Sequence, residues 1–153
     1  MRPTLILAAA LSLGLAAPAF AADLRYVDAD IDALGLVDAA SISKTGDRAT
    51  AGLTLILRQP VQGAHAFTMV LEFDCKARTY RHDRLITFDA ELTRTSESPQ
   101  DSDWQNVGPT SRFEMVRAMA CDGKALPPAG SGDLATLRRN YLATPDENLS
   151  SGE

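Results

Sequence analysis

Residues that commonly build metal and nucleophilic sites are scarce in this sequence. Its 153 residues include only two histidines, His65 and His82, and two cysteines, Cys75 and Cys121. Zinc sites usually combine three or four such ligands at short spacings, and no C-x-x-C or H-x-x-x-H spacing occurs here. The acidic run DADID at 28–32 begins like a calcium loop but lacks the glycine and the glutamate that complete one. We therefore expect no metal and no cofactor.

Signatures of common enzymes are missing as well. The sequence contains no G-x-S-x-G nucleophile turn, no phosphate-binding P-loop and no G-x-G-x-x-G dinucleotide fingerprint. A cysteine nucleophile needs a stabilised thiolate and a base nearby. Cys75 stands in an alternating stretch that places it on an apolar face, and apolar surroundings disfavour the thiolate. We therefore expect that the protein is not an enzyme.

The sequence also lacks an excess of positive charge. It has 15 basic and 20 acidic residues and a net charge of −5 at pH 7. Nucleic-acid affinity comes mainly from cations that neutralise phosphates, so we expect no nucleic-acid partner. One local exception contains Arg78, Arg81 and Arg84, which are weak candidates for binding a partner. The favoured interpretation is that they lie on the solvent-exposed face and edge of a strand, where charged side chains prevent edge-to-edge aggregation.

The N-terminal segment has almost no charge. Arg2 is the only charged residue before Asp23, and an apolar run over 5–17 leads to the small-x-small triplet Ala19–Ala21. This pattern is typical of a secretory signal peptide, and the run is shorter than the roughly 20 residues that span a bilayer. We expect residues 1–21 to be a signal peptide, cleaved after about Ala21, and the protein to be exported to the periplasm or secreted. Because of this short run we expect no membrane span, and because no cysteine ends the segment we expect no lipid anchor.

The remaining sequence fits one domain at 22–143 and a polar tail at 144–153 that we expect to be disordered. In an exported protein, an even number of cysteines indicates a disulfide, and two cysteines allow one pairing. A bond between Cys75 and Cys121 would close a loop of 46 residues. In the chain-entropy treatment, such a bond contributes roughly 4 kcal/mol of stability. A free thiol pair and metal ligation stay open as alternatives.

Apolar and polar residues alternate over several stretches, as in half-buried strands. The alternation is clearest over 49–57 and 67–77, and it places Cys75 on the apolar face. Clean alternation favours an antiparallel sheet with one solvated face. The fold class that we predict is α+β, with a small antiparallel sheet of about five to six strands.

The other sheet boundaries follow from local composition. Strands are expected over about 36–43 and 85–92, and apolar residues alternate over the second of these stretches. The polar, turn-rich stretch 94–103 is expected to be a loop, after which Trp104 and Val107 return to the core.

A C-terminal helix is expected to pack on the sheet. Ser111 and Glu114 form the S-x-x-E pattern of a capping box, and Gly123 suits the position just past a helix end. Cys121 would then lie in the last turn, where a bond to Cys75 would tie this short helix to the apolar face. A second helical period runs over 133–142.

Several short motifs occur in an order that characterises one bacterial family. They are Asp38-Ala39-Ala40-Ser41-Ile42, the turn at Gly46, Asp74-Cys75, Tyr80-Arg81, the stretch Trp104–Ser111 and the terminal Cys121. In this order the sequence resembles the surface-adhesin protein E family over about 24–121. The resemblance implies a small antiparallel sheet with a C-terminal helix tied to it by a disulfide. It also implies binding of host extracellular proteins such as vitronectin, laminin or plasminogen.

Together these expectations describe an exported, non-catalytic binding domain whose ligand the sequence does not name. One alternative is an adhesin that binds host extracellular-matrix proteins. A second alternative is a periplasmic accessory protein with a role in envelope assembly or structure. The expected partner is accordingly a protein, either a host matrix protein or an envelope component.

Overall fold

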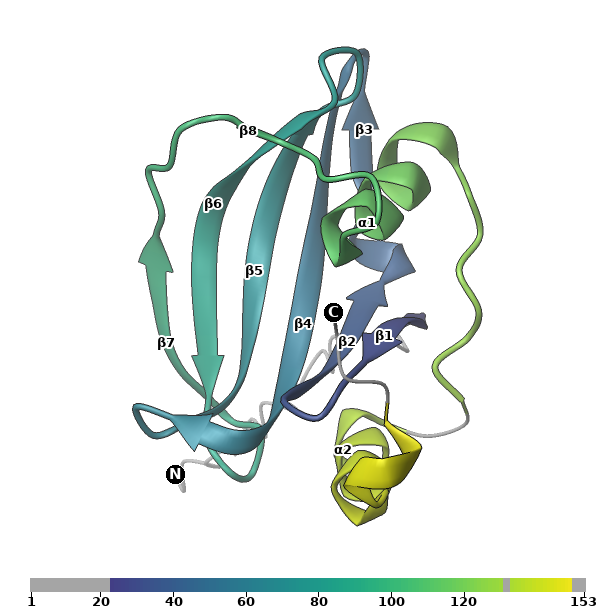
Figure 1. Cartoon of the computed structure of the whole chain (residues 1–153). Helices are drawn as coiled ribbons and strands as arrows, with labels where there is room; N and C mark the ends of the chain where they lie inside the picture. Colours follow the sequence, from purple (N-terminus) through teal and green to yellow (C-terminus); the bar gives the residue numbers. More distant parts are fainter. Residues whose placement is uncertain (1–22, 131–132, 150–153) are drawn as a thin grey trace, which may run out of the picture.

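In the part of the chain that the structure describes, one antiparallel sheet and two α-helices make up the fold (Figure 1). The computed structural model describes residues 23–130 and 133–149, so the expected signal peptide lies outside the described residues. In chain order the elements are β1 (Leu24–Ala29), β2 (Ala33–Asp38), the 3-10 helix η1 (Ala39–Ser41), β3 (Ser43–Thr45), β4 (Arg48–Val61), β5 (Ala64–Asp74), β6 (Thr79–Phe88), β7 (Arg94–Pro99), β8 (Gln105–Asn106), α1 (Arg112–Asp122), α2 (Leu134–Ala143) and the 3-10 helix η2 (Asp146–Asn148).

The strands are ordered β1-β2-β4-β5-β6-β7, with β3 beside β4 and β8 beside β6. All of these pairs are antiparallel. The α+β class and the antiparallel sheet are therefore confirmed. The expected number of strands was too low, because the described residues form eight strands rather than five to six.

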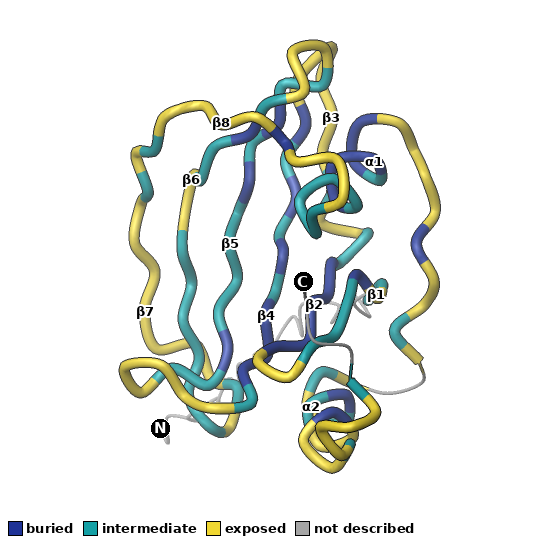
Figure 2. Tube along the Cα trace, in the orientation of Figure 1, coloured by how far each residue is buried: buried dark blue, intermediate teal, exposed yellow. Residues whose placement is uncertain are grey.

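The face of the sheet under α1 carries the larger apolar core. Figure 2 shows buried residues recurring along β4 and β5 and in α1. On β4, the alternate residues from Ala49 to Leu57 are buried, as their period predicted. They pack with Phe73 of β5 and with Val116 and Ala120 of α1. The helix begins and ends where expected, since the Ser111 side chain accepts a hydrogen bond from the Glu114 amide and Gly123 follows with φ of 67°.

The opposite face carries a second core beneath α2. Ile56 and Ala66 are cross-strand partners on β4 and β5, and both are buried although they alternate with the first core. Leu36 of β2 joins them, and α2 covers the cluster with Leu137 and Tyr141. The expectation of one solvated face is therefore wrong at this end of the sheet, where β2 and β4 are buried on both faces.

Arg58 fastens the end of α2 to β4. Its Nη2 donates to the carbonyl oxygens of Tyr141 and Thr144 at 3.2 and 3.0 Å, and its guanidinium carbon lies 4.8 Å from the Tyr141 ring centre. Its Nη1 pairs with Asp146 at 3.1 Å. The tail expected to be disordered, 144–153, contains η2 in its described part, and for residues 150–153, which lie outside that part, disorder stays a prediction.

Two expected strands have different limits in the structure. The strand expected over 36–43 ends at Asp38, whose side chain accepts a hydrogen bond from the Ala40 amide and so begins η1. The strand expected over 85–92 belongs to β6 and ends at Phe88, because Asp89 turns the chain. The Asp89 carboxylate accepts hydrogen bonds from the amides two and four residues later, as Asp does in many turns.

The segment 94–103 corrects the expectation of a loop, because its first part is strand β7. β7 pairs with β6 between Arg84↔Pro99 and Phe88↔Arg94, and all six of its residues are exposed. A strand at the margin of a sheet needs no apolar face, so its polar sequence carries no alternation signal.

Candidate functional site

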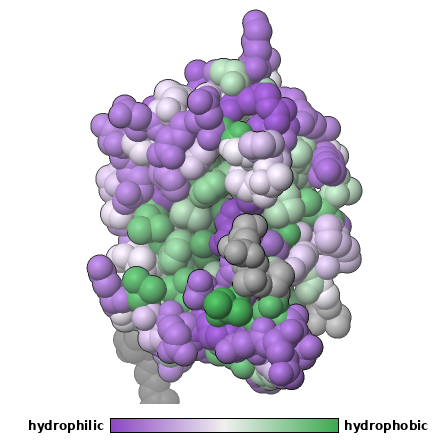
Figure 3. Space-filling view, in the orientation of Figure 1, coloured by the Kyte–Doolittle hydropathy of each residue, from purple (hydrophilic) through white to green (hydrophobic). Residues whose placement is uncertain are grey.

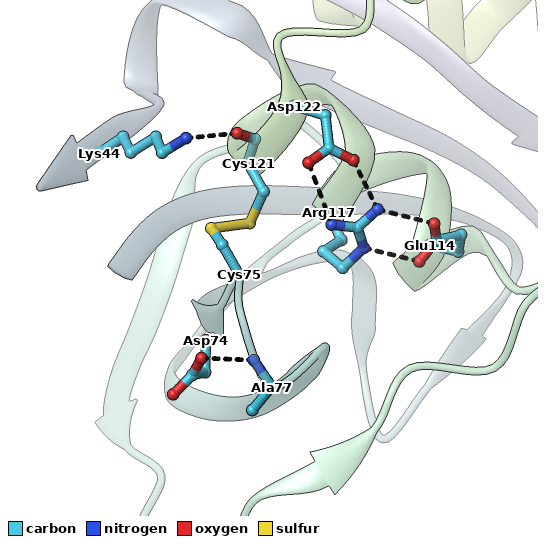
Figure 4. The surroundings of a disulfide bond; sticks show 8 residues. All are labelled: Lys44, Asp74, Cys75, Ala77, Glu114, Arg117, Cys121 and Asp122. Carbon is cyan, nitrogen blue, oxygen red and sulfur yellow. Dashed lines mark hydrogen bonds and ion pairs between the residues drawn. A yellow bond between two sulfur atoms is a disulfide. The ribbon is translucent and has the colours of Figure 1, made fainter. Parts of the chain in front are cut away.

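The disulfide joins α1 to the turn that follows β5 (Figure 4). Cys75 and Cys121 have Cα atoms 5.4 Å apart, and the described residues contain no free cysteine. Asp74 accepts a hydrogen bond from the Ala77 amide at 2.8 Å, which fixes the turn, and Lys44 Nζ donates to the Cys121 carbonyl at 2.5 Å. The predicted bond is confirmed, and it replaces the free-thiol and metal-ligand alternatives.

Beside the disulfide, Arg117 is a buried cation held by two carboxylates of α1 (Figure 4). Only 3 % of this residue is exposed, and its guanidinium donates to Glu114 at 2.7 and 2.9 Å and to Asp122 at 2.7 Å. The hydrogen bonds from Arg117 hold the pKa of both carboxyls below their ordinary values. This cluster stabilises α1 and leaves no charge of Arg117 free to bind a ligand.

An exposed indole with two arginines beside it lies on the face of the sheet opposite α1. We call it the Trp104 patch and define it by Trp104, Arg48, Arg81 and Glu72. The guanidinium carbons of Arg48 and Arg81 lie 4.4 and 5.0 Å from the Trp104 ring centre. Arg81 pairs with Glu72 at 2.6 Å, and Arg48 pairs with Glu72 at 3.8 Å and with Asp74 at 3.3 Å. Salt bridges thus orient both cations beside the indole.

The loop that carries Trp104 is fastened along β6. The His82 amide donates to Ser102 Oγ at 2.8 Å, and the Tyr80 hydroxyl donates to Gln105 Oε1 at 3.1 Å. Gln105 is also the β8 partner of Tyr80. These bonds hold the backbone on both sides of Trp104, so the indole is presented from a fixed segment.

The expected return of the chain to the core holds for Val107 but is wrong for Trp104. Val107 is buried and packs in the core under α1, whereas Trp104 is 37 % exposed. Because Gln105 faces the Tyr80 side chain on the α1 side, strand alternation sends its neighbour Trp104 to the other face. The sequence signal that could have shown this is the polar context of Trp104, between Asp103 and Gln105.

The three arginines proposed as weak partner-binding candidates do not form one stripe. Arg78, in the turn before β6, pairs with Glu114 of α1 at 2.8 Å. Arg81 belongs to the Trp104 patch, and Arg84 pairs with Asp83 at 2.9 Å and with Glu97 at 3.0 Å. Arg81 and Arg84 share the face opposite α1, because a bulge at Asp83 keeps both on it. Their role in binding a partner stays a prediction.

A groove of about 390 Å³ lies on the same face, between the Trp104 patch and the core under α2. Its lining includes the small residues Gly52, Thr54 and Thr68, with Ser41 and Arg84 among the others. The Thr54 and Thr68 hydroxyls bond to each other at 2.7 Å. Among the described residues, no group of three or more histidine, cysteine, aspartate or glutamate side chains is placed to hold a metal ion.

The arrangement is suited to recognition rather than to proton or group transfer. Trp and Arg are the side chains that most often contribute large binding energies in protein interfaces. The sequence model of the surface-adhesin protein E family matches residues 26–122. The chain belongs to the surface-adhesin protein E family.

The matched segment contains almost the whole sheet, α1 and the disulfide, whereas α2 lies outside it. Family membership supports an adhesin-like function, a protein partner and export. Neither a curated protein nor a solved structure matches the chain. Within 23–130 and 133–149, no helix combines the length and the apolar character needed to cross a membrane.

Proposed function

We propose that this member of the surface-adhesin protein E family is an exported, non-catalytic domain that binds a protein partner through the Trp104 patch. The observation that carries the proposal is an indole, 37 % exposed, with two salt-bridged arginines beside it. A large exposed aromatic residue costs solvation free energy, and burial against a partner recovers it.

The patch is ordered before any partner arrives. Glu72 and Asp74 hold the two arginines, and bonds to β6 hold the loop around Trp104. Binding therefore costs little additional side-chain or loop entropy, which is the term that usually reduces interface affinity. The salt-bridged arginines also keep donors for carboxylates or carbonyl oxygens of a partner.

Host extracellular-matrix proteins are the partners that we propose first, because the chain belongs to an adhesin family. The test immobilises vitronectin, laminin and plasminogen separately and measures the dissociation constant of the chain without residues 1–21. Trp104→Ala is compared with Tyr26→Ala, a matched control whose ring is 36 % exposed on β1. We expect Trp104→Ala to weaken binding by about 30-fold, the effect of losing about 2 kcal/mol at an interface hot spot. Tyr26→Ala should stay within twofold.

If the chain shows saturable binding to none of the three proteins, the matrix-protein proposal is contradicted. The alternative, a periplasmic accessory protein of the envelope, is then examined by protease treatment of intact cells. A matrix adhesin is cleaved under these conditions, whereas a periplasmic protein is protected. The N-terminal sequence of the exported protein tests the expected signal peptide, and we expect this sequence to begin after about Ala21.

A further inference from the structure

The two margins of the sheet differ in how their main-chain groups are satisfied. At the β1 margin, the Tyr26 amide donates to the Pro127 carbonyl at 2.9 Å, and the Ala129 amide donates to the Leu24 carbonyl at 3.0 Å. An extended segment of the chain itself therefore covers that edge. At the other margin, β7 pairs only with β6 within the described residues. The outer main-chain donors and acceptors of β7 have no strand beside them.

The charges of β7 all lie on one face. Glu97 accepts a hydrogen bond from Arg84 at 3.0 Å and also pairs with Arg94, both on the face opposite α1. On the α1 face, β7 presents Ser96 and Ser98, which are small and uncharged. Proline and charged residues blunt many exposed edges, but here they leave the α1 side of the strand open.

An uncharged groove adjoins this open side. It has a volume of about 590 Å³, and Phe67 and Leu85 form its apolar part. Thr95 and Ser96 of β7 line one wall, and the tip of the β4–β5 hairpin lines another. Val61 at this tip is 57 % exposed. Figure 3 shows hydrophobic surface on this side of the molecule, and no lining residue carries a charge.

We propose that β7 accepts an extended, uncharged segment of a partner protein as an additional strand, and that the groove takes one of its bulky apolar side chains. Peptide recognition by strand addition combines these two features, since main-chain hydrogen bonds give affinity and a pocket for alternate side chains gives specificity. The occupant is a polypeptide because only another main chain satisfies a row of alternating N–H and C=O groups. The side chain that enters the groove is uncharged, because a charge buried there would find no oppositely charged partner.

This surface is separate from the Trp104 patch. The groove lies on the α1 face through Phe67 and Leu85, whereas the patch lies on the opposite face. A single partner chain does not need to contact both, so the two proposals fail or succeed independently.

The test uses a fluorescent peptide of eight residues with alternating leucine and serine, blocked at both ends, titrated with the chain lacking residues 1–21. We expect saturable binding and slower hydrogen exchange of the β7 amides on binding. An all-serine peptide should bind at least tenfold more weakly, because it leaves the groove empty. The same leucine–serine peptide with N-methylated amides should also lose at least tenfold, because it cannot donate to β7.

Two matched variants locate the site on the protein. Ser96→Trp fills the groove and should weaken peptide binding at least tenfold, whereas Ser98→Trp, on the same face of β7 but outside the lining, should stay within twofold. Equal melting temperatures of the two variants show that both are folded. Three results would each overturn the proposal. The first is equal peptide binding by Ser96→Trp and the wild type, and the second is equal binding of the N-methylated and the unmodified peptide. The third is self-association through β7 without peptide binding.

Discussion

Replacing Cys75 and Cys121 together by alanine removes the covalent tie between α1 and the sheet. The bond closes a loop of 46 residues. The chain-entropy treatment gives about 4 kcal/mol for a loop of this length, because the bond removes open conformations from the unfolded chain. We therefore expect the free energy of unfolding to decrease by about 4 kcal/mol, a large part of the roughly 5–15 kcal/mol of a small domain.

The noncovalent contacts of α1 decide whether the helix stays docked in this variant. Val116 is fully buried against the sheet, and Phe113 stacks on Tyr80 with ring centres 4.5 Å apart. These contacts survive the substitution, so we expect the double variant to fold at room temperature with its helix content unchanged. The destabilisation should then come from the unfolded state rather than from loss of structure.

The assay is urea denaturation followed by far-ultraviolet circular dichroism and by the fluorescence of Trp104, the single tryptophan of the chain. In a separate thermal scan, the melting temperature should decrease by roughly 12–16 °C, at about 3–4 °C per kcal/mol for a domain of this size. Reducing the wild-type disulfide should reproduce the effect. A decrease of less than about 1 kcal/mol in both experiments would refute the reasoning, since the loop entropy would then contribute little.

Three further predictions concern individual side chains. Arg58→Ala removes the clamp at the end of α2, so limited proteolysis should cleave the chain near this helix faster while β4 stays protected; unchanged rates would contradict the clamp. Burial lowers the pKa of His82, so the unfolded state binds a proton more readily and stability should decrease as the pH falls below about 6.5. His82→Gln should remove this part of the pH dependence, measured by urea midpoints between pH 7 and 5; an unchanged pH profile would contradict its assignment to His82. Gly35→Ala places a methyl group against the half-buried Asp28 carboxylate and should lower the free energy of unfolding by about 1–3 kcal/mol. Gly108→Ala, where the nearest atoms lie 3.7 Å away, should leave it nearly unchanged. Equal unfolding free energies of the two variants would contradict the predicted overlap.

The sequence predicted the parts of the fold that depend on local periodicity. Alternate residues from Ala49 to Leu57 are buried as expected, because β4 packs its inner face against α1 and alternation reports that contact directly. The capping box at Ser111 and the glycine at Gly123 set the limits of α1 for equally local reasons. The disulfide followed from the cysteine count, but the alternation over 67–77 overran the strand, because β5 ends at Asp74 and Cys75 begins the turn that follows it.

The sequence did not predict features that depend on neighbouring strands. β7 has no alternation because it lies at an edge, and only pairing with β6 makes it a strand. The bulge at Asp83 reverses the faces of the residues that follow it, so Leu85 faces the α1 side and Ile86 the opposite side. A bulge of one residue leaves no mark in hydrophobic periodicity beyond a break, and a break is also typical of a turn.

The Trp104 patch was missed for a related reason. Tryptophan is usually counted with the core, and its exposure here follows from the way Gln105 pairs with Tyr80. Arg48 and Arg81 are 33 positions apart in the sequence and meet only because β4, β5 and β6 are neighbours. No local pattern could have brought these two cations to one indole.

The ratio of dissociation constants for Trp104→Ala and Tyr26→Ala tests the proposed binding role most directly. Both substitutions remove an aromatic ring of similar exposure, and each is measured against the same immobilised matrix protein. Recognition through the Trp104 patch predicts a ratio of about 15 or more, with Trp104→Ala the weaker binder. A ratio near one, with both variants folded, would contradict it.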